Sequence, residues 1–216
     1  MAMELMDEHE QGERVRQWLR ENGSAIVGGV ALGLAAVVGY QWWGQSKIGH
    51  RADASAQYAA LEAASDRGER DGVEKIAASL AKDFADTPYA ALANLQLAEL
   101  QHKAGEFDAA LSALRRAEAS TTDAGLKELI ASRVARVELA AGRPEQALTT
   151  LAGVTSEGFE AIREDLRGDA LAELGRRDES VAAYRKAHAA YQEGLPGKRL
   201  VEMKLAGLGA KVEADA

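Results

Sequence analysis

The sequence predicts an all-α protein with one N-terminal transmembrane helix followed by a solenoid of paired helices. First, no charged residue occurs between Asn22 and Ser46, although 28% of the 216 residues are charged. Second, a glycine-led phrase recurs after this stretch at intervals near 34 residues, the period of two-helix repeats. Third, alanine, leucine, glutamate and arginine dominate while proline occurs only three times, a composition that favours helices.

The uncharged stretch has the length and the flanks of a membrane anchor, which we place at residues 22–46. About 20 of its residues are apolar or small, and a helix of that length spans roughly 30 Å, the thickness of the hydrocarbon core of a bilayer. All three tryptophans flank it, Trp18 before it and Trp42 and Trp43 at its end, as in interfacial aromatic belts. The alternative of a buried core helix is disfavoured because such helices rarely lack charge on every face. Cleavage as a signal peptide is disfavoured because the bulky segment Tyr40–Trp43 follows the apolar run.

Residues 1–21 are expected to form a short cytoplasmic tail with an amphipathic helix. Val15, Trp18 and Leu19 share one helical face, and Asn22-Gly23 is interpreted as a bend before the anchor. A frayed polar tail is the alternative. Three arginines precede the anchor while Lys47 and Arg51 follow it, so the positive-inside rule favours a cytoplasmic N-terminus by a narrow margin.

Small residues within the anchor suggest a partner helix. Gly29 and Gly33 form a GxxxG pair, and Ala25 lies one turn earlier. Such a surface lets another membrane helix approach closely, so packing at Ala25, Gly29 and Gly33 is a hypothesis. Its alternative is that glycine and alanine are common in membrane helices.

The recurring phrase begins at Gly72, Gly105, Gly142 and Gly175, spaced by 33, 37 and 33 residues. Apolar residues recur with a helical period on both sides of each glycine, which marks the turn between two helices. We therefore expect a connecting helix and turn at 47–72, repeats at 73–193, and a capping helix and tail at 194–216 with its helix at Lys198–Leu208. Thr87-Pro88 is interpreted as an N-cap and first-turn proline. Small residues are expected where paired helices cross: Ala98, Ala135, Gly168, Ala110, Ala147 and Ser180.

The pattern resembles the tetratricopeptide repeat. Alanine five residues after the turn glycine, at Ala110 and Ala147, matches the strongest position of that repeat. The leading tryptophan is missing, the first unit (Tyr58 to Phe84) matches poorly, and one spacing carries three extra residues, assigned to the connection at Ser120–Asp123.

The whole chain resembles the bacterial YfgM-type family of ancillary Sec translocon subunits. The resemblance is carried by Glu21-Asn-Gly23, Trp42, Tyr89–Ala98, Leu166–Ala170 and Met203-Lys-Leu205, together with the single anchor and the repeat number. It implies a bacterial inner-membrane protein with a cytoplasmic N-terminus and a periplasmic repeat domain. It also implies association with the SecYEG channel and with a PpiD-type membrane-anchored periplasmic chaperone, in support of newly translocated, still unfolded polypeptides.

A repeat stack offers a concave surface formed by its first helices. The repeat register predicts partner-binding residues on this surface, namely Leu92, Leu95, Glu99, His102 and Lys103; Leu129, Ser132, Arg136 and Leu139; and Ile162, Asp165, Asp169 and Glu173. The lysine–asparagine clamp for a terminal carboxylate is absent, because Leu95 and Glu99 occupy its places. A broad protein-binding surface is therefore expected; the alternative is that these residues pack within the chain or stay solvated.

Enzymatic and cofactor chemistry is not expected. The chain contains no cysteine, and its four histidines lack a second ligand at helical spacing, so no metal site is expected. Phosphate-loop, nucleophile-elbow and zinc-protease motifs are absent from the sequence. The net charge of −8 without a basic cluster argues against nucleic-acid binding. The remaining alternatives are a scaffold for another bacterial envelope complex and an enzyme with an unrecognised site.

Overall fold

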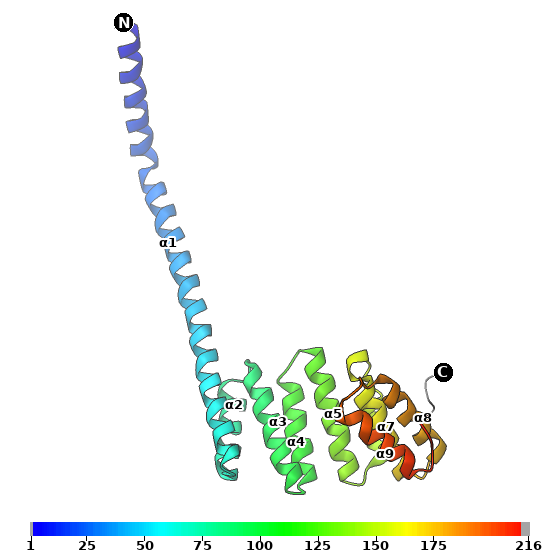
Figure 1. The fold of residues 1–216 in the computed structure, drawn as a ribbon. Helices are drawn as coiled ribbons and strands as arrows, with labels where there is room; N and C mark the ends of the chain where they lie inside the picture. Colours follow the sequence, from blue (N-terminus) through cyan, green and yellow to red (C-terminus); the bar gives the residue numbers. More distant parts are fainter. Residues whose placement is uncertain (1, 213–216) are drawn as a thin grey trace. The chain divides into compact units, whose positions relative to one another are not determined.

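The computed structural model describes residues 2–212, with side chains from residue 12 onward. This part of the chain contains nine α-helices, one short 3-10 helix and no strand (Figure 1). The all-α prediction is therefore confirmed. By their internal contacts the residues form two compact units, one ending at Ala52 and the other beginning at Asp53.

Helix α1 (Ala2–Asp66) contains the predicted anchor. From Gly12 onward it includes an 18-residue window with a mean hydropathy of 1.8, none of which is buried within the protein. Val27 is 69% exposed and Leu32 is 74% exposed, so this helix is long and apolar enough to cross a membrane. Within the described residues, no other helix meets this criterion.

Helix α1 continues through Asn22 and Gly23 without a break, and the bend expected there stays a prediction. The Asn22 side-chain amide donates to the Trp18 carbonyl at 3.0 Å, one turn earlier, so this polar side chain is satisfied inside the helix. Nor does a helix end separate the expected tail, anchor and connecting helix; their boundaries stay predictions from hydropathy.

The unit that begins at Asp53 consists of successive helical hairpins. The last part of α1 pairs with α2 (Arg70–Asp83), α3 (Pro88–Lys103) with α4 (Phe107–Ala119), and α5 (Ala124–Ala140) with α6 (Pro144–Leu151). After the 3-10 helix (Glu157–Phe159), α7 (Glu160–Glu173) pairs with α8 (Arg177–Ala190), and α9 (Pro196–Gly207) follows. Figure 1 shows α2 to α5 in chain order, with α9 in front of the last hairpin in this view.

Each hairpin turns at a glycine in the left-handed region. The φ angles are 71° at Gly68, 77° at Gly105, 70° at Gly142 and 71° at Gly175. At each turn the glycine N–H and the following N–H donate to carbonyls of the preceding helix, as in Gly142 to Leu139 and Arg143 to Glu138. This is the Schellman arrangement, which satisfies the last carbonyls of a helix and favours glycine at the left-handed position.

The first turn glycine is therefore Gly68, and the assignment to Gly72 is wrong. Gly72 lies inside α2. Counting from Gly68, the turn glycines are spaced by 37, 37 and 33 residues, so two spacings carry extra residues rather than one. In this register Val73 takes the place of Ala110, Ala147 and Ser180, and all four are fully buried at 0% exposure.

The other predicted local features are largely confirmed. All six small residues expected at helix crossings are buried. Thr87 is the N-cap of α3 and Pro88 opens it, but the Thr87 hydroxyl donates backward to the Phe84 carbonyl at 2.8 Å instead of accepting from the helix. Ser120–Asp123 connect α4 to α5, and Asp123 caps α5 by accepting from the Leu126 N–H at 2.7 Å. The capping helix α9 begins at Pro196, two residues before the expected Lys198, because proline suits a first helical turn.

Candidate protein-binding groove

Helix α5 provides one wall of a groove along the first helices of the hairpins. Leu129, Ser132, Arg133, Arg136 and Val137 are spaced as i, i+3, i+4, i+7 and i+8, which places them on one helical face. Ile130 lies at the edge of this stripe, seven residues before Val137, and is fully buried in the core. The core therefore fixes the rotation of α5 and with it the direction of the stripe.

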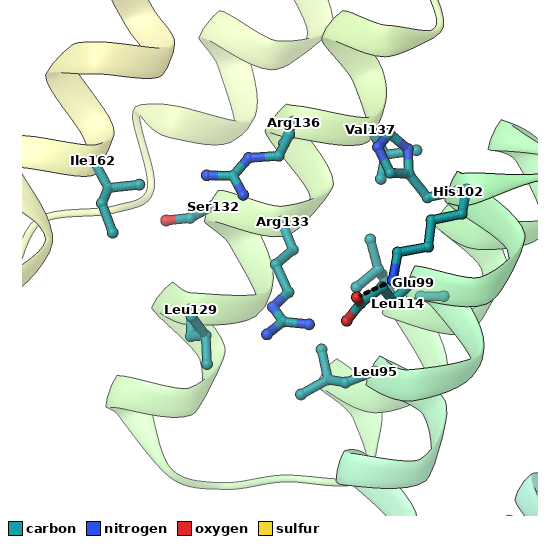
Figure 2. Close-up of a pocket in the computed structure, with 12 residues that line it drawn as sticks. Leu95, Glu99, His102, Leu114, Leu129, Ser132, Arg133, Arg136, Val137 and Ile162 are labelled. Atoms are coloured by element: carbon teal, nitrogen blue, oxygen red, sulfur yellow. Dashed lines mark ion pairs between the residues drawn. The ribbon is translucent and has the colours of Figure 1, made fainter. Parts of the chain in front are cut away.

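This stripe borders a cavity of about 390 Å³, here called the central cavity (Figure 2). Eight of the predicted partner-binding residues line it: Leu95, Glu99, His102, Lys103, Leu129, Ser132, Arg136 and Ile162. The other lining residues are Ala98, Leu114, Arg133 and Val137. The side chains that the repeat register predicted on α3, α5 and α7 therefore lie around one cavity. Arg133 and Val137 were missed as site residues, although they lie one turn from Leu129 and Arg133 respectively on the predicted helix; Leu114 comes from α4.

Polar groups around the central cavity differ in how they are satisfied. Glu99 pairs with Lys103 at 2.8 Å, and the hydrogen bond from Lys103 lowers the pKa of the Glu99 carboxyl. Among the described residues, the guanidinium groups of Arg133 and Arg136 form no hydrogen bond and no ion pair within 4.0 Å. His102 packs against the Phe107 ring with 5.8 Å between ring centroids, and its Nδ1 atom is buried without a hydrogen-bond partner.

A second cavity of about 640 Å³, the C-terminal cavity, adjoins the first. Arg136 lines both. The predicted residues Leu139, Asp165, Asp169 and Glu173 line it. The other lining residues are Tyr184, Leu200, Lys204, Ala140, Leu166 and Ala172. Twelve of the thirteen predicted partner-binding residues therefore line one of two adjoining cavities. The exception is Leu92, which is partly buried and packs against the hydrophobic core.

Helix α9 already engages the two predicted aspartates. The Lys204 ammonium lies 2.7 Å from Asp165 Oδ1 and 2.6 Å from Asp169 Oδ1, and the Tyr184 hydroxyl donates to Asp169 at 2.7 Å. Burial raises the pKa of the Asp165 carboxyl, although Lys204 opposes the shift. Burial and the bond to Asp169 raise the pKa of the Tyr184 hydroxyl. These aspartates thus hold the capping helix in place and differ from the unpaired arginines of the central cavity.

The other buried carboxylates are also engaged within the chain. Glu138 accepts from the Thr150 hydroxyl at 2.8 Å, and Glu164 accepts from Arg163 at 3.1 Å. Arg163 also donates to the Val154 carbonyl at 3.1 Å, which ties α7 to the preceding loop. Among the residues that the structure describes, no group of three metal-ligating side chains lies close enough to hold a metal ion. These contacts link neighbouring segments of the repeat domain.

The predicted helix-packing residues of the anchor lie on the surface of α1. Ala25, Gly29 and Gly33 are exposed, and a Cβ atom added at either glycine would meet nothing within 4 Å. The stripe is open to a neighbouring helix, and its packing with one stays a prediction.

Fold and groove together define a helical repeat protein with an N-terminal membrane-anchor helix. Residues 16–210 match the family described as tetratricopeptide repeat-like domain. The chain is 34% identical to the ancillary SecYEG translocon subunit of Escherichia coli strain K12 over 183 residues, which cover 84% of this chain and 88% of that protein. It is 28% identical over 207 residues to the protein of the same name from Haemophilus influenzae, covering 94% of this chain and 98% of the relative.

The match extends over the anchor and the repeats alike, since it begins before the apolar segment and ends after α9. The chain therefore belongs to this tetratricopeptide repeat-like family, the YfgM-type family that the sequence resembles.

Proposed function

We propose that the protein is a membrane-tethered interaction module that serves as an ancillary subunit of the Sec translocon. The observation that carries the proposal is the end-to-end similarity to relatives named ancillary SecYEG translocon subunit, over an anchor and a repeat domain in the same order. The anchor lies in the bacterial inner membrane, the N-terminus in the cytoplasm and the repeat domain in the periplasm. The proposal assigns no catalytic residue.

The role of the repeat domain is to receive polypeptides that leave the channel, together with a PpiD-type periplasmic chaperone. Two features support this. The groove exposes apolar side chains beside charged ones, as a surface for other polypeptides does. The anchor confines that surface to the membrane, and confinement raises its effective concentration near the channel so that a weak affinity suffices.

Co-purification tests the proposal. The tagged full-length protein is extracted from membranes in a mild detergent, and the proteins retained with it are identified by mass spectrometry. The expected result is enrichment of SecYEG components and of a membrane-anchored periplasmic chaperone over an unrelated single-pass protein with the same tag. Enrichment of a different envelope complex, without any Sec component, would contradict the proposal and favour a scaffold role.

A further inference from the structure

The lining of the central cavity carries three cationic side chains, Lys103, Arg133 and Arg136, but only one carboxylate, Glu99. The chain has a net charge of −8, yet Arg133 and Arg136 have no ion-pair partner among the described residues. The carboxylates closest in the groove are already used, Glu99 by Lys103 at 2.8 Å and Asp165 by Lys204 at 2.7 Å. Arg133 and Arg136 act on Glu99 and Asp165 only through space, so the hydrogen-bond donors of both guanidinium groups are available to an acidic group from outside.

Apolar side chains surround these arginines. Leu95 and Val137 are each 5% exposed and Leu114 is 1% exposed, and they form the buried part of the lining. Leu129 and Ile162 are half-buried and lie on the outer part, with Arg133 between the α3 and α5 walls in Figure 2. A volume of about 390 Å³ is within the range of binding pockets, and this lining suits an apolar side chain.

The groove is elongated, because Arg136 lines both the central and the C-terminal cavity. At the far end the single ammonium group of Lys204 in α9 is shared by two carboxylates, Asp165 and Asp169. The excess of positive charge is thus confined to the central cavity, whereas carboxylates outnumber cations at the far end. This arrangement suits an extended segment better than a small anion, which would use the arginines and leave the apolar lining uncovered.

We propose that the central cavity binds an extended segment of a partner polypeptide that carries an apolar side chain next to acidic residues. The apolar side chain enters between Leu95, Leu129 and Ile162, and the carboxylates pair with Arg133 and Arg136. Guanidinium groups bind carboxylates through two parallel hydrogen bonds, which gives both strength and direction. The inference rests on the proposed function and defines the chemistry of the polypeptides that the module receives.

Binding of short synthetic peptides to the full-length protein in detergent tests this inference by fluorescence anisotropy. The labelled probe alternates leucine and aspartate. One comparison peptide alternates leucine and lysine, and another alternates serine and aspartate. The double variant Arg133→Gln/Arg136→Gln is matched by Arg115→Gln/Lys186→Gln, which removes two exposed positive charges from α4 and α8 outside the cavity. Circular dichroism verifies that both variants remain folded.

The leucine–aspartate peptide is expected to bind more tightly than either comparison peptide. Its Kd should rise about tenfold or more in the cavity variant, since hydrogen bonds to charged groups contribute at least that factor, and stay within about twofold in the control variant. Equal binding of the leucine–lysine peptide, equal binding of the serine–aspartate peptide, or an unchanged Kd in the cavity variant would each overturn the inference.

Co-purification with SecYEG is measured on the same variants. If the wild-type protein does not discriminate between the peptides but still co-purifies with SecYEG, the inference is refuted and the proposed function stands. Intact peptide selectivity in a wild-type protein that retains no Sec component refutes the proposed function and supports the cavity chemistry.

Discussion

Gly168 of α7 lies directly against the ring of Tyr184 of α8. A Cβ atom on Gly168 would lie 2.4 Å from Tyr184 Cδ1 and Cε1, far closer than atoms can approach. The ring has little room to move, because Tyr184 is 3% exposed and its hydroxyl donates to Asp169 at 2.7 Å. Ser180 reinforces the crossing by donating to the Gly168 carbonyl at 2.8 Å. The last hairpin therefore depends on the absence of a side chain at residue 168.

Gly168→Ala is expected to destabilise the repeat domain by roughly 1–3 kcal/mol, the usual effect of overpacking a buried contact. The direction of the stability change is informative, because replacing glycine by alanine inside an ordinary helix stabilises the protein by up to about 1 kcal/mol. Urea unfolding followed by circular dichroism measures the change; tryptophan fluorescence is unsuitable because all three tryptophans lie in α1. Adding Tyr184→Leu should make the cost of the alanine smaller, and an unchanged cost would contradict the steric explanation.

Gly142→Ala is expected to destabilise the protein for a different reason. No atom lies within 4 Å of an added Cβ there, but φ is 70°, and the left-handed conformation costs an L-residue roughly 1–2 kcal/mol. Gly207→Ala is the matched control, because that site is equally open and its φ is not positive. The control should be neutral or slightly more stable. Equal losses at both sites in urea unfolding would refute the assignment of Gly142 as a left-handed turn residue.

Lys204→Met is expected to loosen α9 in a pH-dependent manner. Because burial raises the pKa of Asp165 in the folded protein, the contribution of this carboxyl to stability is fully present below its unfolded pKa. That contribution is lost as the pH rises through the raised, folded pKa. Lys204 opposes the shift, so its removal raises the pKa of Asp165 further and leaves an uncompensated charge at neutral pH.

The expected loss for Lys204→Met is therefore roughly 2 kcal/mol at pH 7 and clearly less at pH 4. Urea unfolding of wild type and variant at both pH values measures it. Lys186→Met removes an exposed lysine of α8 and serves as the control, with little change at either pH. An equal loss of stability at both pH values would contradict the role of Lys204 as the ion-pair partner of Asp165 and Asp169.

Those features of the fold that depend on local sequence could be predicted, and features that depend on distant contacts could not. The hairpin turns at Gly105, Gly142 and Gly175 follow from helical patterns on both sides of each glycine. The first turn was misplaced because Gly68 and Gly72 both occur in a polar segment, and only the backbone conformation distinguishes them. Asn22-Gly23 does not end the helix, and the Asn22 side chain bonds to a carbonyl within it.

The candidate site shows the same division. Leu95, Leu129 and Ile162 follow from the register of α3, α5 and α7, because first helices of successive repeats present equivalent positions to one surface. The pairing of Lys204 with Asp165 and Asp169 spans 39 and 35 residues, and no repeat pattern relates α9 to α7. The sequence therefore indicates which surface the repeats expose. It does not indicate that a lysine of the last helix pairs with two aspartates on that surface.

Membrane topology tests the central claim most directly, since the proposed role requires the repeat domain on the side where polypeptides leave the Sec channel. Alkaline phosphatase, which is active only after export, is fused to the C-terminus of the full-length protein, and a cytoplasmic reporter is fused at the same place in a matched strain. The account predicts an active phosphatase fusion and an inactive cytoplasmic reporter. An inactive phosphatase fusion with an active cytoplasmic reporter would contradict it.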